Sequence, residues 1–559
     1  MSQLGALRTV PWMGHTSQTQ EDERDDMHAR STRFLALAVS LFLLGACTSK
    51  KAANPTKTTQ QPKKGGSFSI ANCEPNYLTP QRNYESCGSQ IFEVLFDRLV
   101  SFDDKGQPVM DQAASVTSDD QKVWTIKIKP GWTFHDGTPV IAQSYVDAWN
   151  WTALGSNEAL LNYFFERVEG YDALNPAKGK AATEQLSGLK VIDDTTFQVT
   201  LTAPFSQFPI QLGFDAFDPL PKAFFDDPKA YNEQPIGDGP YMMDGAWKHN
   251  DTINLKRYPA YPGTPGLADE IKLPEYSASG PGYADLQAGN VDIDAIGSDQ
   301  LLQARKDFTD TLQEHPSSIL LYLGIPLYDK RFQNKFLRQA LSLAVDRQAV
   351  MKAVLVAETP ANSFVVKTVA GYRQGSCTYC HLDVNLAKQK LAQAGGWQGT
   401  MTINFYTDQT LEQALEAVAN QWRQNLGIQD IKLNPINPDS YLDVEYGKKM
   451  TGPWWDSWSQ DYPSIEDYLR PIHGTNGGYN VTTYSNPAFD DLLAEGDSAT
   501  SVAASIASYQ KAEDILAEDM PTIPWGYVGF NLATSPHVTN VLKSGPFDLV
   551  ALEMVQVVP

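Results

Sequence analysis

The apolar residues of this chain change from a strand-like to a helical spacing and back, and this alternation limits the folds open to it. Residues 123–129 alternate apolar and polar side chains, and residues 196–201 repeat that period. Further along, residues 336–354 and 411–426 carry apolar side chains at helical spacing, with an apolar strand pattern at 401–406 between them. Strands and helices that alternate in this way predict α/β lobes with mixed sheets.

A short apolar segment near the start of the chain ends in a cysteine. Arg30 and Arg33 precede the apolar residues 34–44, and Leu-Gly-Ala-Cys occupies positions 44–47. This arrangement resembles the lipobox of bacterial lipoproteins, in which signal peptidase cuts before a cysteine that carries the lipid. The segment is too short to span a bilayer, which takes about 20 residues. A plain secretory signal with a chance cysteine is the alternative, but the polar stretch that follows Cys47 favours lipidation.

The first 26 residues do not resemble the start of a signal peptide, because the acidic run EDERDD occupies positions 21–26. Met27 is followed by His, Ala and Arg and makes a better start. We therefore expect translation to start at Met27, residues 1–46 to be a leader with its signal peptide, and residues 47–65 to be a flexible tether. The mature protein would lie outside the cytoplasmic membrane, held there by acyl chains.

The composition is that of a large acidic globular protein. The body that remains after residue 46 is long enough for two or three domains. Hydrophobic residues make up 42% of the sequence, which indicates large cores, and the formal net charge is −22. So acidic a chain does not bind nucleic acid or anionic lipid by charge, and we expect no nucleic-acid partner.

The four cysteines of the body form two local pairs, Cys73 with Cys87 and Cys377 with Cys380. An oxidising compartment favours two disulfides that close short loops. With His381, the second pair also matches the pattern for covalent haem attachment, Cys-x-x-Cys-His. The segment before it is rich in glycine and serine. We interpret this pair as a structural disulfide, with haem attachment as the alternative.

Motifs of the common exported enzymes do not occur in the sequence. G-x-S-x-G, H-E-x-x-H, the P-loop and G-x-G-x-x-G are all missing, and the eight histidines are scattered singly without zinc-type spacing. Carboxylates are plentiful, but no pair stands out as catalytic. The sequence therefore favours binding over catalysis, with no metal and no cofactor. An exported hydrolase is the alternative from another class, which turnover of peptide or glycoside substrates would reveal.

Several blocks carry a family resemblance. The clearest is WTIKIKPGWTFHDGTP at residues 124–139, followed by Tyr145 and Trp149. Further blocks agree in order, at residues 235–241, 257–261, 336–347, 458–463, 484–490 and 520–524. Together they resemble the periplasmic oligopeptide- and dipeptide-binding proteins of ABC importers, the peptide/nickel family of extracellular solute-binding proteins. The resemblance covers nearly all of the chain from residue 66 to its end.

The resemblance implies an α/β fold of two lobes, the periplasmic-binding-protein or Venus-flytrap fold, with an extra subdomain inserted in lobe I. Lobe I would take residues 66–319, with the subdomain at about 96–215, and lobe II residues 320–527. Residues 528–559 would return to lobe I. A ligand would be buried between the lobes as they close about a hinge. A peptide would lie extended and pair its backbone with strand-like segments of both lobes.

In lobe II, the resemblance implies that Asp461 binds the α-ammonium of the ligand. A desolvated carboxylate makes a charge-assisted hydrogen bond with an ammonium, stronger than a neutral one. Ser457 and Ser459 would supply backbone pairing, Trp458 a pocket wall, and Tyr462 flanks the aspartate. An ordinary turn-capping role is the alternative for Asp461.

In lobe I, the resemblance places Asn83, Tyr84, Glu85 and Ser86 where the family's peptide-pairing segment lies. The disulfide at Cys87 would brace this segment. A plain surface loop is the alternative. The two segments together would hold an extended ligand from both sides of the cleft.

The chain departs from the family pattern at one place. Some members carry an arginine just upstream of the tryptophan at 458, facing the peptide's carboxylate, whereas this chain reads Trp454-Trp455-Asp456. Longer peptides and ligands without a carboxylate therefore stay as alternatives for the ligand. The family also includes members that bind oligosaccharides, nickel complexes or haem, and the tryptophans at 454–458 suit stacking on a sugar.

The sequence therefore predicts a lipid-anchored, extracytoplasmic solute-binding protein that captures oligopeptides and delivers them to the permease of an ABC transporter. We expect a monomer without catalytic activity. Its contact with the bacterial cell membrane would be the lipid at Cys47.

Overall fold

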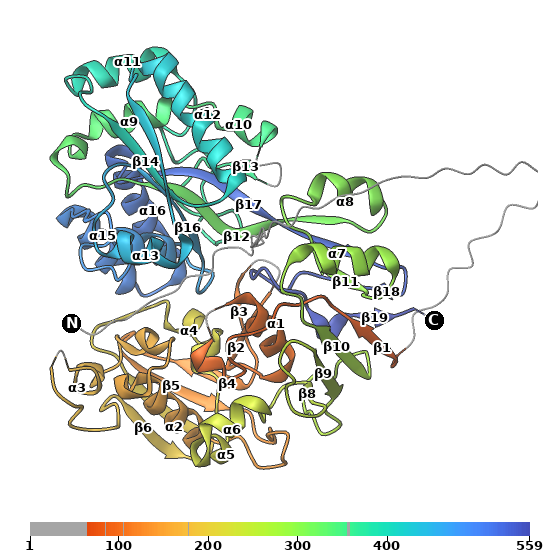
Figure 1. Cartoon of the computed structure of the whole chain (residues 1–559). Coiled ribbons are helices and arrows are strands. Elements are labelled where there is room, and N and C mark those ends of the chain that lie inside the picture. The colour runs from red at the N-terminus through yellow and green to blue at the C-terminus, as the bar shows by residue number, and fades with distance from the viewer. Residues whose placement is uncertain (1–63, 84, 104–105, 177, 355–357, 559) are drawn as a thin grey trace, which may run out of the picture.

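The computed structural model describes residues 64–558 apart from positions 84, 104–105, 177 and 355–357 (Figure 1). The predictions for the leader, for Met27 and Cys47 and for most of the tether lie outside the described residues, as does Tyr84. Within the described part of the chain, no helix has both the length and the apolar character needed to cross a bilayer.

Two bodies lie one above the other in Figure 1, the upper coloured green to blue and the lower mainly red to yellow. Each body has a large hydrophobic core of its own. One core draws on residues 68–293 and 532–557, joined by Tyr462, and the other draws on residues 320–527. The two-lobed α/β fold predicted from the sequence is confirmed. We refer to the lower body as lobe I and to the upper body as lobe II.

The lobes share a sheet built on two long antiparallel strands, β12 (Gln313–Gly324) and β17 (Thr522–Thr534). Their pairing runs from Gln313 opposite Leu532 to Gly324 opposite Thr522, with a register shift between Pro316 and Leu320. The sheet has seven strands in the order β11-β17-β12-β16-β14-β15, with β13 beside β17. The other members are β11 (Ile293–Ala295), β13 (Thr359–Pro360), β14 (Met401–Tyr406), β15 (Ile431–Ile436) and β16 (Trp454–Ser459).

Most helices of lobe II begin at a residue whose side chain caps them. Asp408 accepts a hydrogen bond from the Leu411 N–H at the start of α12 (Gln409–Leu426), and the helix predicted at 411–426 is confirmed. The single helix predicted at 336–354 is wrong, because Asp346 accepts from the Ala349 N–H and starts a second helix there. The other helices are α9 (Lys335–Leu343), α10 (Arg347–Ala353), α11 (Val384–Gln393), α13 (Pro438–Tyr446), α14 (Ile465–His473), α15 (Pro487–Asp497) and α16 (Val502–Asp519).

Lobe I contains two four-stranded sheets, with the orders β1-β10-β9-β8 and β4-β5-β7-β6. In the second, β5 (Val123–Ile128) and β7 (Thr196–Thr200) pair antiparallel, which confirms the strands predicted at 123–129 and 196–201. The helix α2 (Ala142–Ala153) packs on this sheet through ring contacts of Tyr145 and Trp149 with Phe197. The other strands are β1 (Ser67–Ser69), β4 (Ala113–Thr117), β6 (Leu189–Asp193), β8 (Tyr241–Met243), β9 (Thr252–Arg257) and β10 (Glu270–Pro274).

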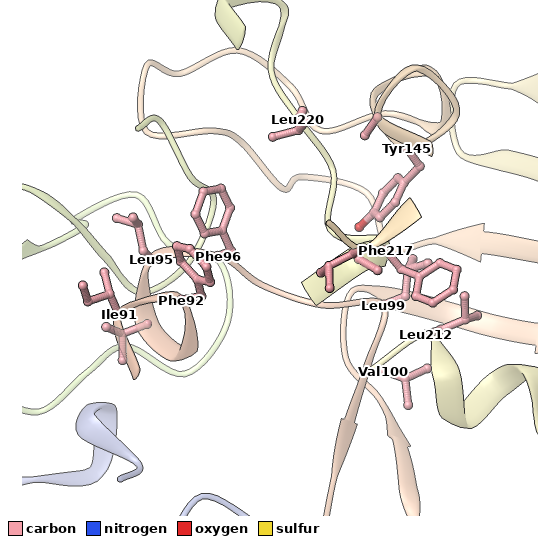
Figure 2. Packing of buried hydrophobic residues seen from close by; sticks show 14 of the residues in the cluster. Ile91, Phe92, Leu95, Phe96, Leu99, Val100, Tyr145, Leu212, Phe217 and Leu220 are labelled. Carbon is pink, nitrogen blue, oxygen red and sulfur yellow. The ribbon is translucent and has the colours of Figure 1, made fainter. Parts of the chain in front are cut away.

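A continuous core connects the two halves of lobe I (Figure 2). Ile91 and Phe92 lie on α1 (Ser86–Leu95), the segment that follows carries Leu99 and Val100, and Phe217 lies in the other half of the lobe. All of these side chains belong to one buried cluster. The sheet of β4 to β7 therefore extends lobe I and shares its core.

The remaining elements of lobe I are short. The helices are α3 (Tyr171–Leu174), α4 (Phe208–Gln211), α5 (Lys222–Asp226), α6 (Pro228–Glu233), α7 (Ser279–Ala288) and α8 (Leu301–Asp307). Two further sheets have two strands each: β2 (Val100–Phe102) pairs with β3 (Pro108–Met110), and β18 (Val538–Thr539) pairs with β19 (Gln556–Val557). In Figure 1, β18 and β19 lie with the strands of the lower body, so the chain returns to lobe I at its end.

Candidate ligand-binding cleft

Strand β16 lies inside the shared sheet and ends close to lobe I. β12 pairs with it from Trp454 to Ser459. On its other side, β14 pairs at one position among the described residues, where the Asn404 N–H donates to the Pro453 carbonyl (2.8 Å). Because backbone groups alternate in direction along a strand, the N–H and C=O groups of Ser457 and Ser459 point toward this second edge, away from β12.

Asp461 lies in the turn after β16 and contacts lobe I directly. Its N–H donates to Oδ2 of Asp467 on α14 (3.0 Å), and its own Oδ2 accepts a hydrogen bond from the hydroxyl of Tyr163 (3.1 Å). Tyr163 belongs to a 3-10 helix, Asn162–Phe165, in lobe I. The carboxylate singled out in the sequence is therefore half-buried at the boundary between the lobes.

Asp467 supports this turn from the core of lobe II. It is buried, and its Oδ2 also accepts a hydrogen bond from the indole N–H of Trp458 (3.1 Å). Burial, followed by the charge of Asp461, raises the pKa of Asp467 well above its usual value. Trp458 is fully buried beside Tyr479, so the ring that the sequence places on a pocket wall packs in the core. Tyr462 is buried as well.

A cavity of about 40 Å³ lies beside Ser457, between β16 and α13. Its acidic residues are Glu445, which accepts a hydrogen bond from the Trp454 indole (2.8 Å), and Asp456. Burial, followed by the charges of Glu445 and Asp456, raises the pKa of the Tyr441 hydroxyl well above its usual value. The aromatic side chains of the wall are Tyr322, Tyr406, Tyr441, Tyr446, Trp455 and Tyr479. The cavity therefore combines aromatic walls with negative charge.

The lobe I residues expected to pair with a ligand lie at the start of α1. Glu85 caps this helix, and its carboxylate accepts a hydrogen bond from the Cys87 N–H (2.6 Å). Burial, partly offset by hydrogen bonds from the backbone, raises the pKa of Glu85 to about 7. Asn83 is buried and donates to the Glu85 carbonyl (2.9 Å), whereas Ser86 is exposed. The structure pairs Cys87 with Cys73, with their Cα atoms 5.4 Å apart.

Charged side chains join the two lobes. Arg167 of lobe I contacts Glu466 (3.1 Å) and Asp497 (3.4 Å) of lobe II, and Arg470 contacts the same two carboxylates. The ring of Phe205 lies 4.0 Å from the Arg167 guanidinium. Burial alone would raise the pKa of Glu466, but the charges of the two arginines outweigh it and lower that pKa. The lobes therefore meet through a largely buried cluster of two arginines and two acids.

Neutral groups extend this contact between the lobes. The Ser206 N–H donates to the Asp497 carbonyl (2.8 Å), and the Ser206 and Ser505 hydroxyls lie 2.6 Å apart. The Ser464 hydroxyl donates to Gln207 (3.1 Å). The sequence did not point to these residues, because partners in such contacts lie hundreds of positions apart and belong to no motif. The same holds for Tyr163, which lies 298 positions from Asp461.

Comparison with known proteins finds relatives over most of this length. The family profile described as "Bacterial extracellular solute-binding proteins, family 5 Middle" matches residues 107–480. The oligopeptide-binding protein OppA of Bacillus subtilis is 26% identical over 477 residues, which cover 81% of this chain and 85% of that protein. The periplasmic murein peptide-binding protein MppA of Escherichia coli is 26% identical over 467 residues, with coverage of 81% and 85%. A solved structure of MppA in its unliganded open form has a TM-score of 0.77 at 23% identity, covering 90% of this chain and 99% of that one.

We expect Arg167→Ala to lower the free energy of unfolding by about 3 kcal/mol near neutral pH, because breaking a buried ion pair leaves uncompensated charge. In the wild type, the lowered pKa of Glu466 stabilises the fold above the usual glutamate pKa of about 4.3, and this contribution is lost as the pH falls through the lowered value. In the variant, burial opposes ionisation of Glu466 more strongly. The difference in the free energy of unfolding between the wild type and the variant should therefore shrink as the pH is lowered, and urea denaturation at several pH values measures it.

Arg305→Ala is the matched control for this experiment. Arg305 and Glu314 form an ion pair whose side chains are 40% and 44% exposed, and solvent screening leaves such a pair worth at most about 1 kcal/mol. If Arg167→Ala and Arg305→Ala lower the free energy of unfolding by the same amount at every pH, the charged cluster does not stabilise the contact between the lobes.

Proposed function

The chain belongs to family 5 of the bacterial extracellular solute-binding proteins, and we propose that it captures oligopeptides between its two lobes and delivers them to an ABC permease. Its relatives are binding proteins, so the chain is a binding protein and not an enzyme, and the hydrolase alternative is set aside. The observation that carries the proposal is the Asp461 carboxylate at the boundary between the lobes, directly after a strand with an outward-facing backbone edge. The names of the relatives OppA and MppA agree with a peptide ligand.

In this proposal, the peptide backbone adds to the edge of β16. Ser457 and Ser459 point their N–H and C=O groups to that edge, and their own side chains are small. Hydrogen bonds between main chains do not depend on the side chains of the ligand, so they give affinity for many sequences. Trp458 and Tyr462 hold the segment in place from the core.

The α-ammonium of the peptide would bind Asp461, with the Tyr163 hydroxyl on the same carboxylate. A charge-assisted hydrogen bond of this kind is about twice as strong as a neutral one. Because Tyr163 belongs to lobe I and Asp461 to lobe II, the ammonium would be bound where closure of the lobes excludes water. Residues 83–86 would complete the site from lobe I, with Tyr84 outside the described residues.

We place the lobe boundaries at 319–320 and 527–528, with the inserted subdomain at about 96–215, and the hinge in β12 and β17. The register shift between Pro316 and Leu320 supports this choice, because the regular pairing breaks there. Ser317 and Ser318 next to it both donate to the carboxylate of Asp548, from the C-terminal segment. Closure would rotate the lobes about these strands.

Other ligands of the family receive less support. Trp454 and Trp458 are fully buried, which leaves Trp455 as the tryptophan of this stretch on the cavity wall, so a surface for sugar stacking is small. Among the described residues, the group with metal-ligating spacing consists of Cys73, Glu85 and Cys87, whose two sulfurs are paired with each other. A peptide is the ligand that this cleft fits best.

We expect Asp461→Ala to weaken the binding of a peptide with a free amino terminus by about 3–5 kcal/mol, as does the loss of one partner of a buried charge pair. Asp461→Asn should also weaken binding, since a neutral amide does not balance the ammonium charge. Isothermal titration calorimetry measures both changes, and the thermal stability of the ligand-free protein should stay nearly constant.

Acetylation of the peptide's amino terminus supplies the second arm of a double-mutant cycle. It should weaken binding to the wild type strongly and to Asp461→Ala only slightly. If acetylated and free peptides bind the wild type equally well, Asp461 caps a turn and does not bind the ligand.

We further propose that the protein is a monomeric lipoprotein, anchored at the outer face of the cytoplasmic membrane through Cys47, after translation from Met27. The lipobox-like segment supports this proposal. Cys47→Ala should accumulate as an uncut precursor, and mass spectrometry of the wild type should show a diacylated cysteine as the first residue. A gene version that starts at Met27 should be exported equally well. A lipid-free mature protein with another first residue would contradict the proposal.

Both cysteine pairs would be disulfides in the exported protein. Denaturation without reductant should expose no thiol at Cys73, Cys87, Cys377 or Cys380 that reacts with a maleimide. In the loop-entropy model, the link between Cys73 and Cys87, with a sequence separation of 14, stabilises the fold by about 3 kcal/mol. Reduction should lower the urea midpoint accordingly. Reactive thiols in unreduced protein, or a mass increase from covalent haem at Cys377 and Cys380, would exclude this assignment.

A further inference from the structure

A short hairpin near the end of the chain, residues 543–550, lies beside the proposed hinge. Lys543 and Val550 form an antiparallel bridge at its base. The hairpin is fixed to lobe I, because Val550 lies in the core of that lobe and its backbone exchanges two hydrogen bonds with the side chain of Gln90 on α1 (2.8 and 2.9 Å). We call this segment the C-terminal hairpin.

Asp548 of the C-terminal hairpin binds β12 at the point where β12 loses its regular pairing with β17. At the register shift, β12 has the residues 317–319 where β17 has only Val528. Oδ2 of Asp548 accepts hydrogen bonds from the Ser318 N–H (2.9 Å), the Ser318 hydroxyl (2.8 Å) and the Ser317 hydroxyl (2.7 Å). The carboxylate thus supplies partners to the hinge strand where its neighbour does not, and bonds to a charged acceptor are stronger than neutral ones.

Lys543 holds the Asp548 carboxylate in this position. The charged groups lie 3.2 Å apart, and the two side chains are 11% and 19% exposed. Ser317 and Ser318 are buried. Because the contact is largely shielded from water, breaking it leaves polar groups without partners, which costs more free energy than the bonds contribute on average.

The tip of the C-terminal hairpin contacts lobe II. The buried side chain of Gln460 donates from Nε2 to the Pro546 carbonyl (3.0 Å). Gln460 follows β16 and directly precedes Asp461. Its Oε1 lies 3.4 Å from the hydroxyl of Tyr468, which donates to the Ser318 carbonyl. The turn of the candidate site, the hairpin and the hinge strand therefore meet at one buried glutamine.

A rotation of the lobes about the proposed hinge would disturb both contacts of the hairpin. Gln460 would move with lobe II, whereas Pro546 would stay with lobe I. A hydrogen bond of this kind is lost once its two heavy atoms are more than about 3.5 Å apart, so a small displacement near the hinge is enough to break it. The bend at residues 317–319 would likewise turn the serines away from Asp548.

We propose that the C-terminal hairpin is a latch that holds the lobes closed, with Gln460 as a positioning residue, and that it thereby prolongs the stay of a bound ligand. The inference rests on the proposed binding between the lobes and on the proposed hinge. Contacts that exist in the closed arrangement and are lost in the open one shift the population toward closure. Gln460 turns its side chain to Pro546 and acts on the ligand through closure alone.

The test removes the donor and follows the two rates of binding. Gln460→Leu keeps nearly the same size and cannot donate to Pro546. Stopped-flow fluorescence with a penta-alanine peptide that carries a fluorophore at its carboxyl end should show dissociation about fivefold faster than from the wild type, as expected for the loss of one hydrogen bond. The association rate constant should stay within about twofold, because the ligand enters before the lobes close. Asp548→Asn removes the charge that Lys543 pairs with and should act in the same direction.

Gln313→Leu is the matched control. The side chain of Gln313 also donates to a carbonyl of the C-terminal segment, that of Val541 (3.1 Å). Gln313 pairs with Leu532 at the lobe I end of β12, so this bond does not join the two lobes. Both rates should equal those of the wild type. If Gln313→Leu accelerates dissociation as much as Gln460→Leu, the effect comes from a general loosening of the segment and the latch is overturned.

The remaining outcomes separate this inference from the proposed function. If the peptide leaves Gln460→Leu and Asp548→Asn at the wild-type rate, the latch fails and peptide binding stands. Slower association with unchanged dissociation would show that these residues shape the ligand site and would overturn the latch as well.

If the peptide does not bind the wild type, the proposed function fails, and small-angle X-ray scattering of the ligand-free protein decides on the latch. The double variant Gln460→Leu with Asp548→Asn should then have a larger radius of gyration than the wild type, because its lobes open more often. An unchanged radius of gyration would overturn the inference.

Discussion

The antiparallel pairing of β12 with β17 is the contact on which both lobes and the cleft depend. The two strands run side by side between the two large cores, so each lobe is attached to the other by two covalent connections that are themselves paired. β16 pairs with β12, and the turn with Asp461 follows β16 directly. The position of the candidate site is therefore set by the strands about which the lobes would move. In the proposed hinge motion, a displacement at the register shift near Pro316 would change the distance between the lobes, while β16 would keep its place on β12.

The largely buried cluster of Arg167, Arg470, Glu466 and Asp497 adds a polar contact between the lobes, and its energetics differ from those of the sheet. Removing four charged groups from water costs free energy, and the attraction between the opposite charges offsets that cost only when the geometry is good. Such a cluster contributes little to stability compared with an apolar core, but it tolerates few alternative arrangements. It therefore favours one closed geometry, in which Tyr163 reaches Asp461. Apolar contact alone would let the lobes meet in several ways.

Local patterns in the sequence predicted local structure. The strands at 123–129 and 196–201 and the helix at 411–426 follow from the periodicity of their apolar residues. The helix expected at 336–354 is split because Asp346 offers its carboxylate to the backbone of a new first turn, an effect that periodicity does not register. In the candidate site, the family blocks located Asp461 and its strand. They did not reveal Tyr163, which lies 298 positions away, or the burial of Trp458, because both depend on how the lobes pack.

In the proposed mode of binding, the charge of Asp461 also determines which way round a peptide binds. Asp461 follows β16 directly, and its carboxylate would attract the positively charged amino terminus of the peptide. A peptide bound in the reverse direction would bring its own carboxylate to Asp461. That arrangement would place like charges together, which costs affinity even where every backbone hydrogen bond is kept. Main-chain pairing would thus admit many peptides, whereas Asp461 would restrict their direction.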